Sequence, residues 1–196
     1  MSKLKNILLY CLGCVMLWAA CYYGTHYYMD LRSDRVVPPQ AYLYHYIHQE
    51  PYIEGPPAFQ ENIKKALATV EKVSPEQYKD IEKYCIRVRL DDRYNKVSAV
   101  AYNSTVYVIK NRYNKDKNCV YYLERLVIHE ATHLKQYEQN QGSETIEKRE
   151  AESLASERKL LRNLKIPPAD IERVAGDHLL KTRWWEKVNK NVMGRN

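Results

Sequence analysis

The sequence lacks internal repeats and extended blocks of consecutive basic residues. Its 31 Lys and Arg residues outnumber its 24 Asp and Glu residues, which gives a formal net charge of +7. Acidic and basic residues are interleaved, as in Glu147-Lys148-Arg149-Glu150, and this pattern is typical of a solvated surface. The charge therefore argues against nucleic acid as a partner, and it favours association with an anionic membrane or cell wall.

Cysteine is scarce outside the N-terminal segment. Cys11, Cys14 and Cys21 lie in an apolar stretch, where thiols act as small hydrophobic groups. Cys85 and Cys119 are the remaining two cysteines. Outside the cytoplasm these two could form a disulfide.

A long apolar run occurs near the N-terminus, from Ile7 to Tyr23. Its 23 − 7 + 1 = 17 residues reach the lower limit of about 17–25 for a spanning helix. Lysines precede the run and tyrosines end it, which predicts a signal anchor in residues 1–30, with its N-terminal side in the cytoplasm. Two alternatives are a signal peptide, although no clear A-x-A cleavage site is present, and lipoprotein processing at Cys21. Each places the domain on the extracytoplasmic side, periplasmic or extracellular.

Residues 31–57 show little helical or alternating pattern and contain Pro38-Pro39 and Pro56-Pro57. We expect an extended or irregular tether rich in Pro and Tyr, whose aromatic segment Tyr44–His48 packs on the domain surface. The remaining residues, 58–196, have the size of one ordinary domain.

The pattern of residues 58–196 predicts an α+β fold, in which helices pack on one face of a small twisted sheet of three or four strands. Ser74 and Pro75 mark a helix start, and Asn103-Ser104 is a short turn between two alternating segments. We expect helices over 58–73, 75–84, 121–137, 144–164 and 169–187, and strands over 86–90, 97–102 and 105–109.

The most informative motif is His129-Glu130-Ala131-Thr132-His133, which reads H-E-x-x-H within an expected helix. Residues four apart share a helix face, so both imidazoles point at one spot. Two neutral imidazoles at this spacing bind zinc at about 2.0–2.1 Å each. Glu130 lies at the edge of that face, where it reaches a water on the metal. The motif therefore supplies a metal and a base together, as amide hydrolysis requires.

Together with the hairpin upstream, this motif resembles the zincin metallopeptidases, and among them the gluzincins, whose third zinc ligand is a Glu on the next helix. The metzincin extension is absent, because Leu134–Glu138 contains neither the Gly nor the third His that it needs. Small zincins place such a hairpin before the metal helix, and its edge strand pairs with extended substrate. The resemblance covers about residues 58–185 and implies a zincin-like fold with a metal helix followed by a ligand helix.

The third ligand is expected on the helix over 144–164. The buried face of that helix is defined by Ile146, Leu154, Leu161 and Leu164. Glu150 lies within this face, Glu147 lies nearer its side, and Glu152 points away. Because a carboxylate on an apolar face is costly unless it is paired or bound to metal, Glu150 is the predicted ligand and Glu147 the reserve.

Two features leave alternatives open. Glu150 could instead form an ion pair with Arg125 or Arg149. In gluzincins an Asp follows the ligand Glu, whereas Leu154 occupies that place after Glu150. The carboxylate that usually orients a ligand histidine is therefore missing or comes from elsewhere.

The resemblance implies a membrane-tethered zinc metallopeptidase that hydrolyses a peptide or protein substrate. His129, His133 and Glu150 would hold Zn²⁺, and Glu130 would act as general base. The residue that stabilises the oxyanion is open: His178 is the first candidate, and Tyr102 and Tyr107 cannot be ranked against it. The alternative is a non-catalytic zincin-fold component of an envelope or secretion assembly.

Overall fold

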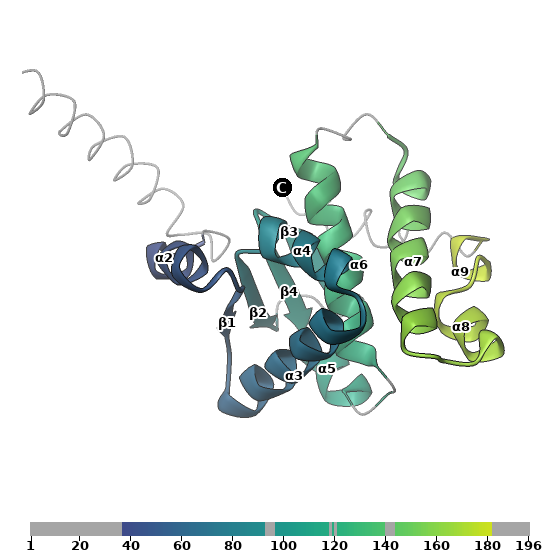
Figure 1. Ribbon diagram of the computed structural model, residues 1–196, viewed down its shortest axis with the longest axis horizontal. Coiled ribbons are helices and arrows are strands. Elements are labelled where there is room, and N and C mark those ends of the chain that lie inside the picture. The colour runs from purple at the N-terminus through teal and green to yellow at the C-terminus, as the bar shows by residue number, and fades with distance from the viewer. Residues whose placement is uncertain (1–36, 93–96, 118, 120, 140–143, 182–196) are drawn as a thin grey trace, which may run out of the picture. The chain divides into compact units, whose positions relative to one another are not determined.

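The computed structural model describes residues 37–92, 97–117, 119, 121–139 and 144–181, and Figure 1 shows how their helices and strands are arranged. All of them belong to the unit Val37–Asn196. The predicted anchor, residues 1–30, lies outside the described residues. None of the helices in the described ranges has the length and apolar character that a membrane span needs.

The sheet is small and mixed. It contains β1 (Tyr52–Glu54), β2 (Arg87–Asp91), β3 (Ala99–Tyr102) and β4 (Thr105–Ile109), in the order β1-β2-β4-β3. β1 and β4 both run parallel to β2, whereas β3 pairs antiparallel with β4. The predicted hairpin is confirmed, and its turn residues Asn103 and Ser104 adopt left-handed backbone angles, with φ of 45° and 54°. β3 is therefore an edge strand.

Three helices supply most of the core that packs with the sheet: α3 (Pro57–Val73), α4 (Pro75–Tyr84) and α6 (Tyr122–Glu138). Tyr113 and Leu160, from two other helices, also belong to this core. Val88, Val106 and Val108 point to the same sheet face, because residues two apart on a strand share a face, and all three are fully buried in this core. The helices add Phe59, Ile63, Val70, Ile81, Leu126 and Val127. The predicted α+β class is confirmed.

The rest of the chain forms a second, smaller hydrophobic cluster. α7 (Ile146–Asn163) begins at Thr145, whose hydroxyl accepts a hydrogen bond from the Lys148 backbone N–H at 3.3 Å. α8 (Pro168–Ala175) and α9 (His178–Lys181) follow, and Figure 1 shows them beside α7, which in turn lies beside α6. The cluster is formed by Leu154, Leu161, Ile171 and Ala175.

The prediction of an irregular tether over residues 31–57 is wrong for its described part. Pro39 opens α2 (Pro39–His48), and β1 follows within the same segment. The proline pairs indicated polyproline structure, but Pro39 and Pro57 occupy first-turn helix positions, where the missing N–H costs nothing. Because β1 pairs with β2, a chain cut at residue 58 would lose a strand of the sheet.

Three smaller expectations also need correction. The short helix α5 (Lys110–Asp116) was not predicted. The single helix expected over 169–187 is divided into α8 and α9 at Gly176-Asp177, and residues 182–187 lie outside the described part. The Ser74 hydroxyl does not cap α4; it donates to the Gln77 side chain at 2.6 Å. Cys85 is buried, Cys119 is exposed, and both are free thiols.

Candidate metal centre

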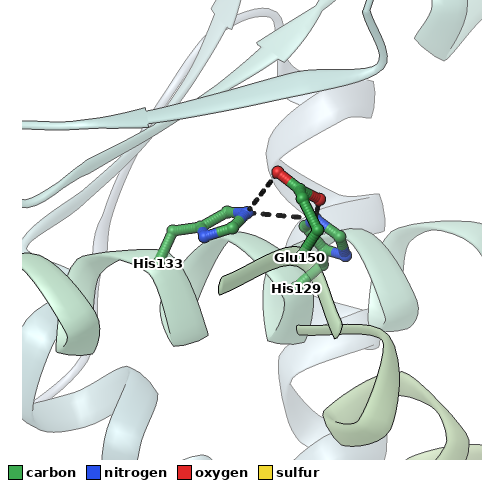
Figure 2. A group of neighbouring side chains, drawn as sticks. All are labelled: His129, His133 and Glu150. Carbon is green, nitrogen blue, oxygen red and sulfur yellow. Dashed lines mark hydrogen bonds and ion pairs between the residues drawn. The ribbon is translucent and has the colours of Figure 1, made fainter. Parts of the chain in front are cut away.

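All three predicted metal ligands come together between α6 and α7. Figure 2 shows the His129 and His133 rings of α6 and the Glu150 carboxylate of α7 pointing at one another. The two Nε2 atoms are 3.2 Å apart. Glu150 Oε2 lies 3.3 Å from His129 Nε2, and Glu150 Oε1 lies 3.4 Å from His133 Nε2. This group could hold a metal ion.

The other nitrogen of each histidine has its own partner, which fixes the tautomer. His133 Nδ1 contacts Gln136 Oε1 at 2.9 Å. The orientation of that amide follows from its nitrogen, which donates to the Arg149 carbonyl and to the Glu152 carboxylate. Because Gln136 Oε1 can only accept, His133 Nδ1 carries the proton, and Nε2 of the neutral ring presents a lone pair.

His129 is oriented by Glu157, which lies two turns after Glu150 on α7. The Nδ1 atom of His129 donates to Glu157 Oε1 at 2.7 Å. The other oxygen of Glu157 accepts from Arg125 Nε at 2.9 Å, and Arg125 also donates to the Val174 carbonyl at 2.8 Å. Both lone pairs of the ligand histidines therefore point into one space, as metal-binding histidines require.

The donor set fits a small divalent cation. With neutral rings, two nitrogen lone pairs and a carboxylate face one another with no proton between them, and Glu150 Oε2 is buried without a hydrogen-bond partner. Bonds of about 2.0–2.1 Å separate neighbouring tetrahedral ligand atoms by roughly 3.3–3.4 Å, close to the 3.2 Å between the two Nε2 atoms and the 3.3 Å between His129 Nε2 and Glu150 Oε2. One ligand atom from each of the three residues lies within 4.8 Å of the others. A cation would relieve this repulsion.

In the absence of a metal, the carboxylates around His129 favour its protonated form. Burial alone would lower the pKa of His129, but the Glu150 and Glu157 carboxylates outweigh it and hold the pKa well above its usual value. Burial alone would raise the pKa of Glu150, but the neighbouring His129 and His133 rings outweigh it and lower that pKa to about 2. The centre therefore attracts positive charge.

Glu130 is buried beside this centre. Burial is the main cause that raises its pKa; the two histidines oppose the shift, and the carboxylates of Glu150 and Glu157 add to it. A raised pKa makes Glu130 a stronger base than an ordinary carboxylate. With His129, Glu130 lines a cavity of about 340 Å³.

The cavity has mostly apolar walls. It lies between the N-terminal half of α6, the middle of α7, the α8–α9 region and the start of β3. Its lining residues are Val97, Ser98, Ala99, Tyr122, Arg125, Leu126, His129, Glu130, Leu154, Glu157, Val174 and Leu179. An apolar side chain of a ligand would fit beside the metal centre.

The other carboxylates considered for the third ligand lie elsewhere. Glu147 is exposed. Glu152 is half-buried and accepts a hydrogen bond from Gln136 Nε2 at 2.8 Å, so the expectation that it points to solvent is wrong. The alternative pairing of Glu150 with Arg125 is also wrong, because Arg125 binds Glu157, while the Arg149 guanidinium lies over the Tyr137 ring.

The three candidates for oxyanion stabilisation are not among the described residues that line the cavity. His178 is half-exposed on α9, with Nδ1 3.7 Å from the Glu172 carboxylate. Tyr102 is exposed at the end of β3. Tyr107 is buried and accepts a hydrogen bond from Arg87 at 3.3 Å. Tyr122 does line the cavity, and burial raises its pKa to about 12, against the opposing effect of the nearby Ser98.

Sequence reasoning missed the residues that orient the ligands: Glu157, Arg125 and Gln136. Helical spacing could have identified two of them. Arg125 lies four residues before His129, and Gln136 lies three residues after His133. Residues at these spacings are neighbours on a helix. Comparison of the chain with protein families, with curated proteins and with solved structures found no match. The proposed function therefore rests on the chemistry of the metal centre itself.

Proposed function

We propose that this chain is a zinc metallopeptidase of the gluzincin type. The observation that carries the proposal is the convergence of His129, His133 and Glu150 beside the buried Glu130. Two imidazoles and one carboxylate with an open fourth position form the ligand set of catalytic zinc sites in peptidases. The same set also suits non-haem iron, but a carboxylate base next to the metal is the arrangement that hydrolysis uses.

His129, His133 and Glu150 would hold the ion, which supplies a Lewis acid and lowers the pKa of a bound water towards about 7. Glu130 accepts the proton of the attacking water and delivers it to the leaving amine. Glu157 and Gln136 keep the two rings in the tautomer that binds metal.

The substrate is an extended peptide or protein segment. The edge strand β3 offers backbone groups for pairing, and residues at its start line the apolar cavity next to Glu130. A peptide that pairs with this strand across the metal centre would place an apolar side chain in that cavity. We therefore expect cleavage beside a large apolar residue.

The chain is proposed to be held at a membrane through Ile7–Tyr23, with the metal centre on the extracytoplasmic side. The lysines before this run and the tyrosines at its end support this orientation.

Metal analysis and one isosteric variant test the enzymatic proposal. The purified full-length chain should contain about one zinc per molecule and cleave peptides from a mixed-sequence library. Glu130→Gln should retain the zinc and lose hydrolysis, since an amide cannot accept the proton. Glu138→Gln, at an exposed position on the same helix, is the matched control and should stay active. Zinc binding without any hydrolysis by the unsubstituted chain would favour the non-catalytic alternative.

A further inference from the structure

The outward face of α2 is apolar. Ala41 is fully buried, and the Tyr44 ring packs against the rings of Tyr52 and His48 at centroid distances of 5.7 and 4.4 Å. These residues place one side of α2 against the domain, next to β1 (Figure 1). The opposite side carries the large side chains Tyr42, Leu43, Tyr46 and Ile47.

These four side chains form a continuous patch, which we call the α2 patch. At about 100° per residue, positions 42, 46, 43 and 47 span an arc of roughly 140°. Their exposed fractions are 51, 79, 61 and 61%, and they are four of the six large hydrophobic residues that are exposed in the described part of the chain. Large exposed apolar patches mark interaction sites.

The composition of α2 indicates what covers the patch. The helix PQAYLYHYIH contains no Lys, Arg, Asp or Glu, so a partner recognised by charge has nothing to bind on the helix itself. Two tyrosines beside a leucine and an isoleucine match the boundary between lipid headgroups and acyl chains, where amphipathic rings and aliphatic side chains are both stabilised.

The short stretch of chain between the N-terminal apolar run and α2 is a second argument that a membrane covers the α2 patch. Ile7–Tyr23 ends 39 − 23 = 16 residues before α2 begins at Pro39. Sixteen residues span at most about 55 Å when fully extended. If the run is held in a bilayer, α2 is therefore confined to a short distance from the same bilayer surface, where weak apolar contacts bind effectively because their local concentration is high.

We propose that α2 lies along the outer surface of the membrane, with Tyr42, Leu43, Tyr46 and Ile47 in the interfacial layer, and that it holds the domain in one orientation on the bilayer. The inference rests on the membrane attachment proposed above. It does not depend on the metal centre or on catalysis.

The test places an environment-sensitive NBD fluorophore on Tyr46→Cys in the full-length chain, reconstituted in phosphatidylcholine vesicles. Cys11, Cys14, Cys21 and Cys119 are replaced by Ser. Cys85 is retained, because its thiol is buried and burial raises its pKa to about 12, so that labelling should spare it. The control carries the label on Lys72→Cys, at an exposed position of α3.

The label at position 46 should show a shift of its emission to shorter wavelength and a severalfold rise in intensity on reconstitution, and nitroxide lipids should quench it. The label at position 72 should keep its aqueous emission. The shift should persist at high salt, because no ion pairs are involved. Adding Leu43→Ser and Ile47→Ser should abolish it while metal content stays unchanged.

Each contrary outcome has a separate meaning. Protein that sediments with vesicles while position 46 keeps its aqueous emission would overturn the α2 inference and leave membrane attachment standing. Protein that stays in the supernatant would overturn both. A shift that appears without lipid and grows with protein concentration would show that a second copy covers the patch, which also overturns the inference.

Discussion

Replacement of Glu157 by Gln isolates the contribution of the residue that orients a metal ligand. Glu157 is buried, and its Oε1 lies 2.7 Å from Nδ1 of the predicted ligand His129. The amide keeps the shape of the carboxylate and removes its charge. One amide oxygen cannot accept at full strength from both His129 and Arg125, and the amide N–H₂ would face a donor.

The expected loss of zinc affinity is 10–100-fold, the range typical of residues that hold a ligand histidine. This corresponds to about 1.4–2.7 kcal/mol of binding free energy. The loss should be smaller than for removal of a ligand, because all three donor atoms remain. Competition with a chromogenic chelator at pH 7 measures the affinity of the full-length protein in detergent.

Glu147→Gln is the matched control, since it removes the same charge from an exposed position of the same helix. Its zinc affinity should equal that of the unsubstituted chain. Equal affinities for Glu157→Gln and the control would refute the argument that Glu157 orients His129. A complete loss of zinc in Glu157→Gln would instead identify Glu157 as a ligand.

Three further predictions concern the same centre. Glu150→Ala should lose zinc far more severely than Glu152→Ala, because the Glu152 carboxylate accepts a hydrogen bond from Gln136 and is not among the three predicted ligands. The reverse order in metal analysis would reassign the third ligand. In the metal-free protein, the folded state raises the pKa of His129 above its unfolded value of about 6.5. The stabilisation that this shift supplies is fully present below the unfolded pKa. The free energy of unfolding should therefore fall as pH rises through the folded pKa. Urea unfolding from pH 6 to 9 should show this decline without zinc and little of it with zinc, where the ring is neutral throughout; a flat metal-free profile would contradict it. Val174→Trp should fill part of the cavity and leave the zinc content unchanged. It should reduce kcat/KM more for peptides with a large apolar side chain than for peptides with a small one. Equal effects on both kinds of peptide would show that the cavity does not bind the substrate side chain.

Local patterns in the sequence predicted the elements that carry the metal. Alternation around Asn103-Ser104 identified the hairpin, and 3.6-residue spacing identified α6 and α7. The phase of α7 selected Glu150 because Leu154 and Leu161, one and three turns further along, fix which side of the helix is buried. Each of these signals depends on residues close together in the chain, so a single sequence is enough to detect it.

Contacts between distant elements could not be predicted in the same way. β1 has three residues and exists because it pairs with β2, more than 30 residues later. Glu157 lies on the same helix as the predicted third ligand, yet its contact with His129 depends on how α6 and α7 pack. Glu152 has the phase of an exposed residue, but Gln136 of the neighbouring helix reaches it.

Because the buried apolar residues form two clusters, a bound metal would also affect the stability of part of the fold. His129 and His133 project from α6, which packs in the larger cluster. Glu150 belongs to α7, whose Leu154 and Leu161 pack in the smaller cluster and whose Leu160 packs in the larger one. A bound cation would add to the connection between the two clusters that Leu160 already makes. Removal of the cation should therefore speed amide hydrogen exchange in α7 and α8 and leave β2 and β4 protected, so that the metal would govern local opening as well as chemistry.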